Sequence, residues 1–280
     1  MKRIPFSQVL KNASIDLRRE YDRLYALFYV QRTFIGTKNS YSLRDFCASY
    51  FTELPFRGTC ISLEDFDDFY GYHFEEEPSE FDIDYLVSFC EYSFNLLFYY
   101  QTPNGSVPFV SENLPIQFYL DQVSMVIEDI GYMKNFHDHV IDFVPKDHVA
   151  ISVAEIIDRN LSYRVIEYNH HTMKGDINRK KTILIALADK LEPLRLELKN
   201  INSNLEDDLF FLFNSINLRH NNIDPNGKHY AKTVSDMKND ELEKWYDDVY
   251  QMCLLAFLEL DNTERENRVK KLRKDIKSNK

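Results

Sequence analysis

Apolar side chains recur at steps of three and four residues along most of the chain, which is the period of amphipathic helices. The clearest example is the stretch whose apolar positions are Leu205, Leu209, Leu212, Phe213 and Ile216. This spacing predicts a helix over 204–222. Similar spacing predicts further helices over 14–35, 42–52, 62–70, 82–101, 116–143, 147–160, 161–173, 177–200 and 241–260. No stretch is identified as a strand, so the sequence predicts an all-α fold, a multi-helix bundle.

Polar residues and one proline set several of the expected helix boundaries. Ser42 and Ser62 precede apolar-periodic segments and are typical N-caps. Ser62 also has an aspartate three positions later, in a capping-box arrangement. Pro193 is expected to break the helix over 177–200 near Glu192, because proline lacks a backbone donor and clashes with the preceding turn.

Composition agrees with long helices. The chain of 280 residues has only 7 glycines, against 18 tyrosines and 21 phenylalanines, which argues against a turn-rich β-sandwich. No run of eighteen apolar residues appears, and the first residues lack the apolar segment of a signal peptide. We therefore expect a cytoplasmic protein without a membrane span. The 4 cysteines lie among apolar residues, which predicts reduced, buried thiols.

Charge is distributed unevenly along the chain. The net charge is −11, with eleven acidic and no basic residues over 62–91 and eight basic against three acidic residues over 263–280. An acidic chain argues against a protein that coats nucleic acid, whose affinity depends on neutralising phosphates. The acidic net charge is still compatible with a small basic cleft. The basic tail either steers RNA by charge attraction or is a solvent-exposed end, and the lack of interleaved aromatics favours the second interpretation.

The strongest candidate for chemistry follows the apolar stripe of 205–216. Arg219 lies seven residues beyond Leu212, where burial of its charge requires carboxylate, carbonyl or phosphate partners. Arginine binds phosphate oxygens and histidine exchanges protons near neutral pH, so the set is suited to phosphate chemistry. The alternative, which residue chemistry alone favours, is that Arg219, His220 and Asn222 bond the last carbonyls of the helix. The polar residues that gather after Arg219, on both sides of an Asp-Pro-Asn-Gly turn, are His220, Asn221, Asn222, Lys228 and His229.

The stretch SINLRHNNIDPNGKHY at 215–230 resembles the Arg-polar-x(4–6)-His signature of the HEPN superfamily. Its members are all-α proteins, common in bacterial toxin–antitoxin and abortive-infection phage-defence systems. Many are metal-independent endoribonucleases whose site forms where two motifs meet across a dimer. The resemblance implies a HEPN-like helical bundle over 80–262, with the signature on the third of four helices. An N-terminal helical extension over 1–75 and a basic C-terminal tail over 263–280 would flank it.

The same resemblance implies the function and the roles of residues. The chain would be an endoribonuclease, a toxin or phage-defence effector, that needs no metal and no cofactor. Its partners would be RNA, a second copy in a homodimer, and an antitoxin or another defence protein. Arg219 would stabilise the phosphoryl transition state, and His229, or failing that His220, would move protons to yield a 2′,3′-cyclic phosphate and a 5′-hydroxyl. The substrate-binding residues would be Asn221, Asn222 and Lys228.

The spacing of the signature keeps other functions open. Nine residues lie between Arg219 and His229, where the family usually has four to six, and a loop around the turn at 224–227 would hold the excess. The long spacing and the net charge of −11 favour an alternative, a non-catalytic HEPN-like module that binds RNA or a protein partner. A third class is a structural helical scaffold, in which internal carboxylates would occupy Arg219 fully.

Two histidine clusters, at 137–139 and 170–171, lack the i, i+4 spacing at which imidazoles on a helix converge on zinc. We therefore expect surface histidines and no metal site. Tyr168, Asn169 and His170 would line the cleft if their segment packs on the motif helix. The sequence has no signature of a nucleotide-binding loop, a hydrolase elbow or a zinc protease.

Overall fold

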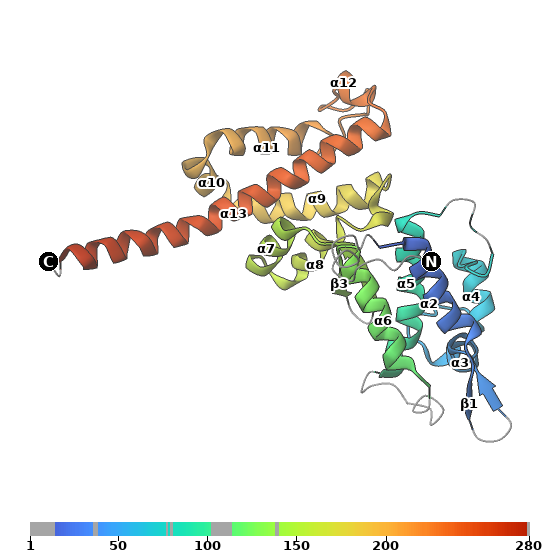
Figure 1. Cartoon of the computed structure of the whole chain (residues 1–280). Helices are drawn as coiled ribbons and strands as arrows, with labels where there is room; N and C mark the ends of the chain where they lie inside the picture. Colours follow the sequence, from blue (N-terminus) through green and yellow to red (C-terminus); the bar gives the residue numbers. More distant parts are fainter. Residues whose placement is uncertain are drawn as a thin grey trace, which may run out of the picture. The chain divides into compact units, whose positions relative to one another are not determined.

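The computed structural model describes residues 15–35, 39–76, 78, 81–101, 114–137 and 140–278. The chain forms two compact units, residues 1–145 and 146–280, here called unit 1 and unit 2. With 70% of its residues in helices, the fold is mostly helical, which confirms the expected class in its coarse form (Figure 1). Two small hairpins accompany the helices, and they were not expected.

Unit 1 consists mainly of helices whose first residues are capped by side chains. Asp16, Ser42, Ser62 and Asp82 each accept a bond from the backbone N–H three residues later, which satisfies one of the free donors at a helix start. The helical elements described in this unit are α2 (Leu17–Tyr25), the π-helical turn η1 (Ala26–Val30), α3 (Leu43–Tyr50), η2 (Phe51–Glu53), α4 (Leu63–Tyr70), α5 (Ile83–Phe98), η3 (Tyr99–Gln101) and α6 (Ile116–Asp129).

Both predicted serine caps are confirmed, but the complete capping box forms at Ser42. There the Ser42 hydroxyl accepts from the Asp45 N–H at 3.0 Å, and the Asp45 carboxylate accepts from the Ser42 N–H at 3.1 Å. At Ser62, where the box was expected, the hydroxyl accepts from the Asp65 N–H as predicted. The Asp65 carboxylate, however, accepts from the Ile61 N–H at 2.9 Å, one residue earlier.

Two antiparallel hairpins in unit 1 correct the expectation of helices alone. β1 (Thr33–Ile35) pairs with β2 (Asn39–Tyr41), so the helix predicted over 14–35 is replaced by strand at its end. β3 (Tyr132–His137) pairs with β4 (Val140–Pro145), in a register that sets Tyr132 opposite Pro145.

The helix predicted over 116–143 ends at Asp129 because the chain turns at Gly131. Gly131 has φ +83°, a left-handed conformation that glycine adopts without the strain that a Cβ brings. β4, the second strand of the hairpin that follows this turn, is fixed to α5 by a side chain. The Asn95 amide donates to the Ile141 carbonyl and accepts from the Ile141 N–H, both at 2.8 Å.

The core of unit 1 is rich in aromatic rings and joins residues on both sides of 75–80. The ring of Tyr21 in α2 lies 5.0 Å from that of Phe89 in α5, and the Tyr100 hydroxyl donates to the Tyr50 carbonyl. The extension expected over 1–75 therefore shares one core with α5 and α6, and the division of the chain falls after Pro145 instead. The acidic stretch before residue 80 resembles a linker, but the helices on either side of it bury their apolar faces against one another.

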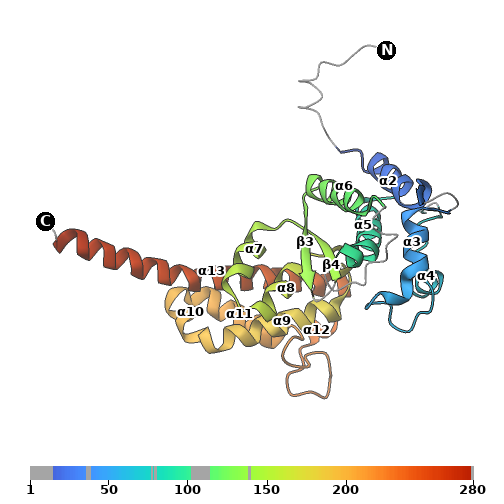
Figure 2. The ribbon, with the colours of Figure 1, turned by 90° about the horizontal axis from the view of Figure 1, so that it is seen from below.

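All the regular secondary structure among the described residues of unit 2 is helical, and its longest helix carries much of the core. α13 contacts α7, α9, α10 and α11 (Figure 2). Tyr246, Val249 and Cys253 on α13 are fully buried. The elements are α7 (His148–Ile156), α8 (Arg159–Glu167), η5 (His171–Met173), α9 (Ile177–Leu191), η6 (Glu192–Leu194), α10 (Arg195–Ile201), α11 (Ser203–Ser215), α12 (Lys232–Ser235) and α13 (Asn239–Ser278).

Several expectations for unit 2 are confirmed and others are corrected. The break near Glu192 is confirmed, since α9 gives way there to the 3₁₀ turn η6 that contains Pro193. The helix expected over 241–260 is longer, because α13 runs on without interruption to Ser278. All four cysteines of the chain are free and buried, as predicted. Among helices in the described part of the chain, none is long and apolar enough to cross a membrane.

Candidate functional site

α11 ends at Ser215, well before the predicted position near 222, and this places the candidate residues in a loop. Asn217 has φ +61°, a left-handed conformation that asparagine tolerates better than most residues, and the chain leaves the helix there. The Arg219 N–H then donates back to the Phe213 carbonyl at 3.0 Å. Arg219 therefore does not continue the apolar stripe of α11. Residues 216–231 are called the Arg219 loop below.

Asn222 holds the Arg219 loop together from inside. Its side chain is buried, and its Oδ1 accepts from the Asn217 N–H at 2.8 Å. Its Nδ2 donates to the Asn214 carbonyl at 3.1 Å and to the His229 carbonyl at 2.8 Å. One of these bonds satisfies a carbonyl left free by the end of α11. The structure thus gives Asn222 a structural role rather than the predicted contact with substrate.

The predicted turn at Asp224-Pro225-Asn226-Gly227 is confirmed. The Asp224 carboxylate accepts from the Asn226 N–H at 2.9 Å, and the Asp224 carbonyl accepts from the Gly227 N–H at 2.9 Å. Aspartate commonly stabilises such turns through its own side chain. A Cβ at Gly227 would lie only 3.2 Å from the Asp224 carbonyl oxygen, so glycine suits this position. The turn reverses the chain within the loop.

The reversal stacks His229 on His220. Their ring centroids are 4.0 Å apart and their planes differ by 9°. His220 is half-buried, whereas His229, Lys228 and Asn221 are exposed. The eight residues between His220 and His229 therefore bring the two predicted proton-transfer residues into direct contact, and Asn221 and Lys228 lie at the surface of the same loop.

The Arg219 guanidinium is paired with carboxylates at the end of α9 and in η6. Its Nη1 donates to Glu192 Oε2, and its Nη2 lies 3.8 Å from Asp189 Oδ1. Its Cζ lies 5.2 Å from the centroid of the Phe213 ring. The Arg219 side chain is 19% exposed, whereas Glu192 is 48% and Asp189 71% exposed. Because both carboxylates face water, these are weak ion pairs that an anion from solution can compete with.

The segment Tyr168 to His170, which was expected to line a cleft, is bonded to other parts of unit 2. The Tyr168 hydroxyl donates to Asp247 at 3.0 Å, and its ring stacks on Tyr250 with centroids 4.0 Å apart. The Asn169 amide donates to the Asp147 carboxylate at 3.2 Å. Tyr168 and Asn169 thus contact α13 and the residue that caps α7.

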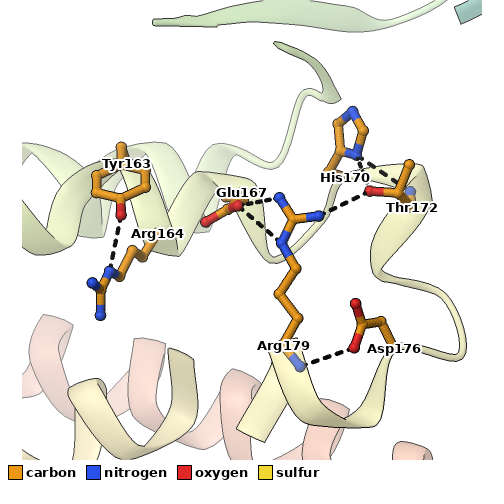
Figure 3. Close-up of polar contacts among 7 residues, drawn as sticks. All are labelled: Tyr163, Arg164, Glu167, His170, Thr172, Asp176 and Arg179. Atoms are coloured by element: carbon orange, nitrogen blue, oxygen red, sulfur yellow. Dashed lines mark hydrogen bonds and ion pairs between the residues drawn. The ribbon is translucent and has the colours of Figure 1, made fainter. Parts of the chain in front are cut away.

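His170 belongs to a polar cluster that fixes the link between α8 and α9 (Figure 3). Its Nδ1 accepts from the Thr172 N–H at 3.3 Å and lies 2.7 Å from the Thr172 hydroxyl oxygen. Arg179 of α9 donates to Glu167 of α8 at 3.1 Å and to the same hydroxyl at 3.2 Å (Figure 3). In the other histidine cluster, Asp138 and His139 lie outside the described residues.

Buried charges are features of unit 2 that the sequence interpretation missed. Lys180 is 6% exposed and pairs with Glu243 and Asp247, each at 2.7 Å. Glu206 is fully buried and accepts from Arg195 Nε at 2.5 Å. The sequence holds a signal for both, because each charge lies on the apolar face of its helix, where a charge needs a partner.

Comparison of the chain with protein-family models, with curated proteins and with solved structures gives no match. A proposal for its function therefore rests on the residues of the Arg219 loop and on the resemblance of 215–230 to the HEPN signature.

Proposed function

We propose that this chain is a HEPN-like helical module that binds RNA through the Arg219 loop without cleaving it. The observation that carries the proposal is the contrast between two motif residues. Arg219 directs a donor at Glu192 and is mostly buried, whereas His229 is exposed beside Lys228. An arginine that stabilises a phosphoryl transition state must aim its donors at the phosphate.

The exposed side chains of the loop have the chemistry that single-stranded RNA requires. Bases stack on aromatic rings, including the imidazole of histidine, and cations attract the phosphates. His229 supplies a ring, Lys228 a charge and Asn221 an amide at one exposed surface.

The segment around the loop is basic although the chain is acidic. Residues 216–238 contain four basic side chains, Arg219, Lys228, Lys232 and Lys238, and two acidic ones, Asp224 and Asp236. The segment therefore has a charge of +2 with histidines neutral, against −11 for the chain. A locally basic loop supports attraction of phosphate at this position.

The histidine stack favours one second candidate, the metal-independent endoribonuclease of a toxin or phage-defence system. Cleavage through the 2′-hydroxyl requires one group to accept a proton and another to donate one. His220 and His229 place two imidazoles 4.0 Å apart. Because Glu192 and Asp189 face water, an RNA phosphate can displace them from Arg219 in this mechanism.

The binding of fluorescently labelled single-stranded RNA to the full chain, measured by anisotropy in EDTA and low salt, tests the proposal. His229→Ala should raise Kd at least about fivefold, because stacking contributes about 1 kcal/mol or more per base. Lys228→Ala should also weaken binding and reduce its dependence on salt. His148→Ala is the matched control, since His148 is exposed on α7 of the same unit. Equal Kd values for the wild type and all three variants would refute binding through this loop.

A further inference from the structure

The C-terminal part of α13 lies beyond the helices that cover its first half. Every side chain from Glu264 to Ser278 is exposed, and both views show this segment leaving the rest of unit 2 (Figures 1 and 2). Three large apolar side chains lie on it, Val269 at 46%, Leu272 at 58% and Ile276 at 54% exposure. An isolated helix of this length is only marginally stable in water. Packing of these apolar side chains against a partner would therefore stabilise the helix.

The apolar positions follow the heptad spacing of a coiled coil. Val269, Leu272 and Ile276 lie at steps of three and four. The same steps back towards the bundle reach the polar Arg265 and Asn262 and then the apolar Leu258 and Leu255. In heptad notation the a positions are Leu255, Asn262, Val269 and Ile276, and the d positions are Leu258, Arg265 and Leu272. Such a stripe is the seam along which two helices pack.

The charges along the same segment identify the partner as a second copy of this chain. Residues 259–266 contain Glu259, Asp261, Glu264 and Glu266 against Arg265, a charge of −3. Residues 268–277 contain six basic side chains against Asp275, a charge of +5. In antiparallel orientation the acidic end of one copy lies beside the last basic residues of the other, and the positions that flank the seam pair opposite charges, Glu266 with Arg273 and Arg268 with Asp275. A parallel pair sets like charges side by side.

We propose that residues 262–278 of α13 pair with the same segment of a second copy as an antiparallel two-helix coiled coil. A pairing centred between Lys270 and Lys271 sets Val269 opposite Leu272 of the second copy. It also brings Glu266 to Arg273 of the second copy, and Arg268 to Asp275 of the second copy. This surface is separate from the Arg219 loop, and the proposal does not depend on the proposed function.

A cavity at the start of the exposed segment matches this arrangement. It has a volume of about 380 Å³ and lies where α13 passes α7, α9 and α10, and its charged lining residues are Asp158, Lys190, Glu197, Asp261 and Glu264. Lys190 already pairs with Asp158 at 2.9 Å, and Arg265 pairs with Asp261, so the carboxylates in excess are those of Glu197 and Glu264. In the antiparallel pair the basic end of the second copy, with Lys274 and Lys277, reaches this acidic cavity.

Sedimentation equilibrium of the full chain over a range of concentrations tests the pairing. We expect a monomer–dimer equilibrium, with a dissociation constant that rises at least tenfold in Leu272→Lys. Phe211→Lys is the control, because Phe211 is 64% exposed on α11 and lies off the stripe. A wild type that stays monomeric at every concentration, or a Leu272→Lys variant that dimerises as well as the wild type, would overturn the proposal.

Charge reversal tests the orientation of the two helices. Glu266→Arg should weaken an antiparallel dimer, because it sets arginine against Arg273 of the second copy. Adding Arg273→Glu to the same chain should restore the affinity. In a parallel dimer Glu266→Arg would instead face Asp261 of the second copy and strengthen the pair, so that result would refute the antiparallel arrangement. Far-UV circular dichroism of each variant verifies that α13 remains helical.

Discussion

Arg219 and Glu206 show how exposure to water decides the role of a charged residue in unit 2. The carboxylates beside Arg219 are 48% and 71% exposed, so pairing there is weak and open to exchange. Glu206 has no exposed side-chain surface, and Arg195 and Lys199 meet it at 2.5 Å and 3.5 Å. The hydrogen bond from Arg195 lowers the pKa of the Glu206 carboxyl from its ordinary value of 4.5. The ion pairs of Arg219 are thus weak, whereas those of Glu206 stabilise the fold.

Replacement of Glu206 by glutamine should destabilise the protein by about 2 kcal/mol near neutral pH, because it removes the buried charge that accepts a hydrogen bond from Arg195 and pairs with Lys199. The pKa of Glu206 is lower in the folded than in the unfolded state. The stability that the ionised Glu206 side chain contributes to the folded protein is therefore complete above pH 4.5, and it is lost as the pH falls through the folded-state pKa. Urea denaturation at pH 7 and at pH 3 should show the gap between the wild type and Glu206→Gln shrinking in acid.

The exposed neighbour Asp207 on the same helix supplies the control for Glu206. Asp207→Asn should change the free energy of unfolding by no more than about 0.5 kcal/mol. A gap between the wild type and Glu206→Gln that stays constant from pH 7 to pH 3 would show that the buried charge is not the cause.

Single residues differ in how far the sequence reveals their roles. Glu206 and Lys180 can be recognised as buried charges, because each falls on an apolar helix face. The contact of His220 with His229 cannot, because it depends on a turn and on the bonds of Asn222 across the loop. Asn222 was expected to contact substrate. An asparagine amide offers the same donor and acceptor whether it binds a ligand or holds a loop together, so the sequence does not separate these two roles.

The end of α11 is the element that most changes the candidate site. Ile216 and Leu218 are both buried and extend the apolar sequence, yet the helix ends at Ser215 because Asn217 turns left-handed. Helices that begin at a clear cap, such as α3 and α4, were predicted almost to the residue. A helix end fixed by a side chain five residues later, as here, has no local signal.

Replacement of Asn222 by alanine should therefore destabilise unit 2 by about 2 kcal/mol, since it breaks three hydrogen bonds and leaves buried backbone groups without partners. The adjacent Asn221 is exposed, and Asn221→Ala should stay within about 0.5 kcal/mol of the wild type. Urea midpoints of the two variants provide the comparison. Equal midpoints would mean that the bonds of Asn222 do not organise the loop.

At the scale of the whole molecule, the described residues form two hydrophobic cores, and each core consists of residues of one unit. The buried apolar residues of the first core lie between Tyr21 and Phe143, and those of the second between Ala150 and Phe257. The expected boundary near 75–80 missed this division because it followed the extent of the HEPN resemblance, whereas the first core continues across it. Which apolar faces share a core depends on contacts between distant helices, and helical spacing does not specify these contacts.

Because the second core is complete within unit 2, residues 146–280 should fold when expressed alone. We expect a single cooperative thermal transition and a helical far-UV spectrum for this fragment. The RNA affinity of the fragment should match that of the full chain, because the Arg219 loop lies wholly within it. A fragment without a cooperative transition would show that unit 2 depends on unit 1.

The most direct test of RNA binding without cleavage uses one labelled single-stranded RNA, incubated with the full chain in EDTA and run on native and denaturing gels. We expect a shifted band on the native gel, intact RNA on the denaturing gel, and, at the same protein concentration, a weaker shift with His229→Ala. RNA fragments made by the wild type, and by neither Arg219→Ala nor His229→Ala, would contradict the proposal. They would establish the ribonuclease in its place.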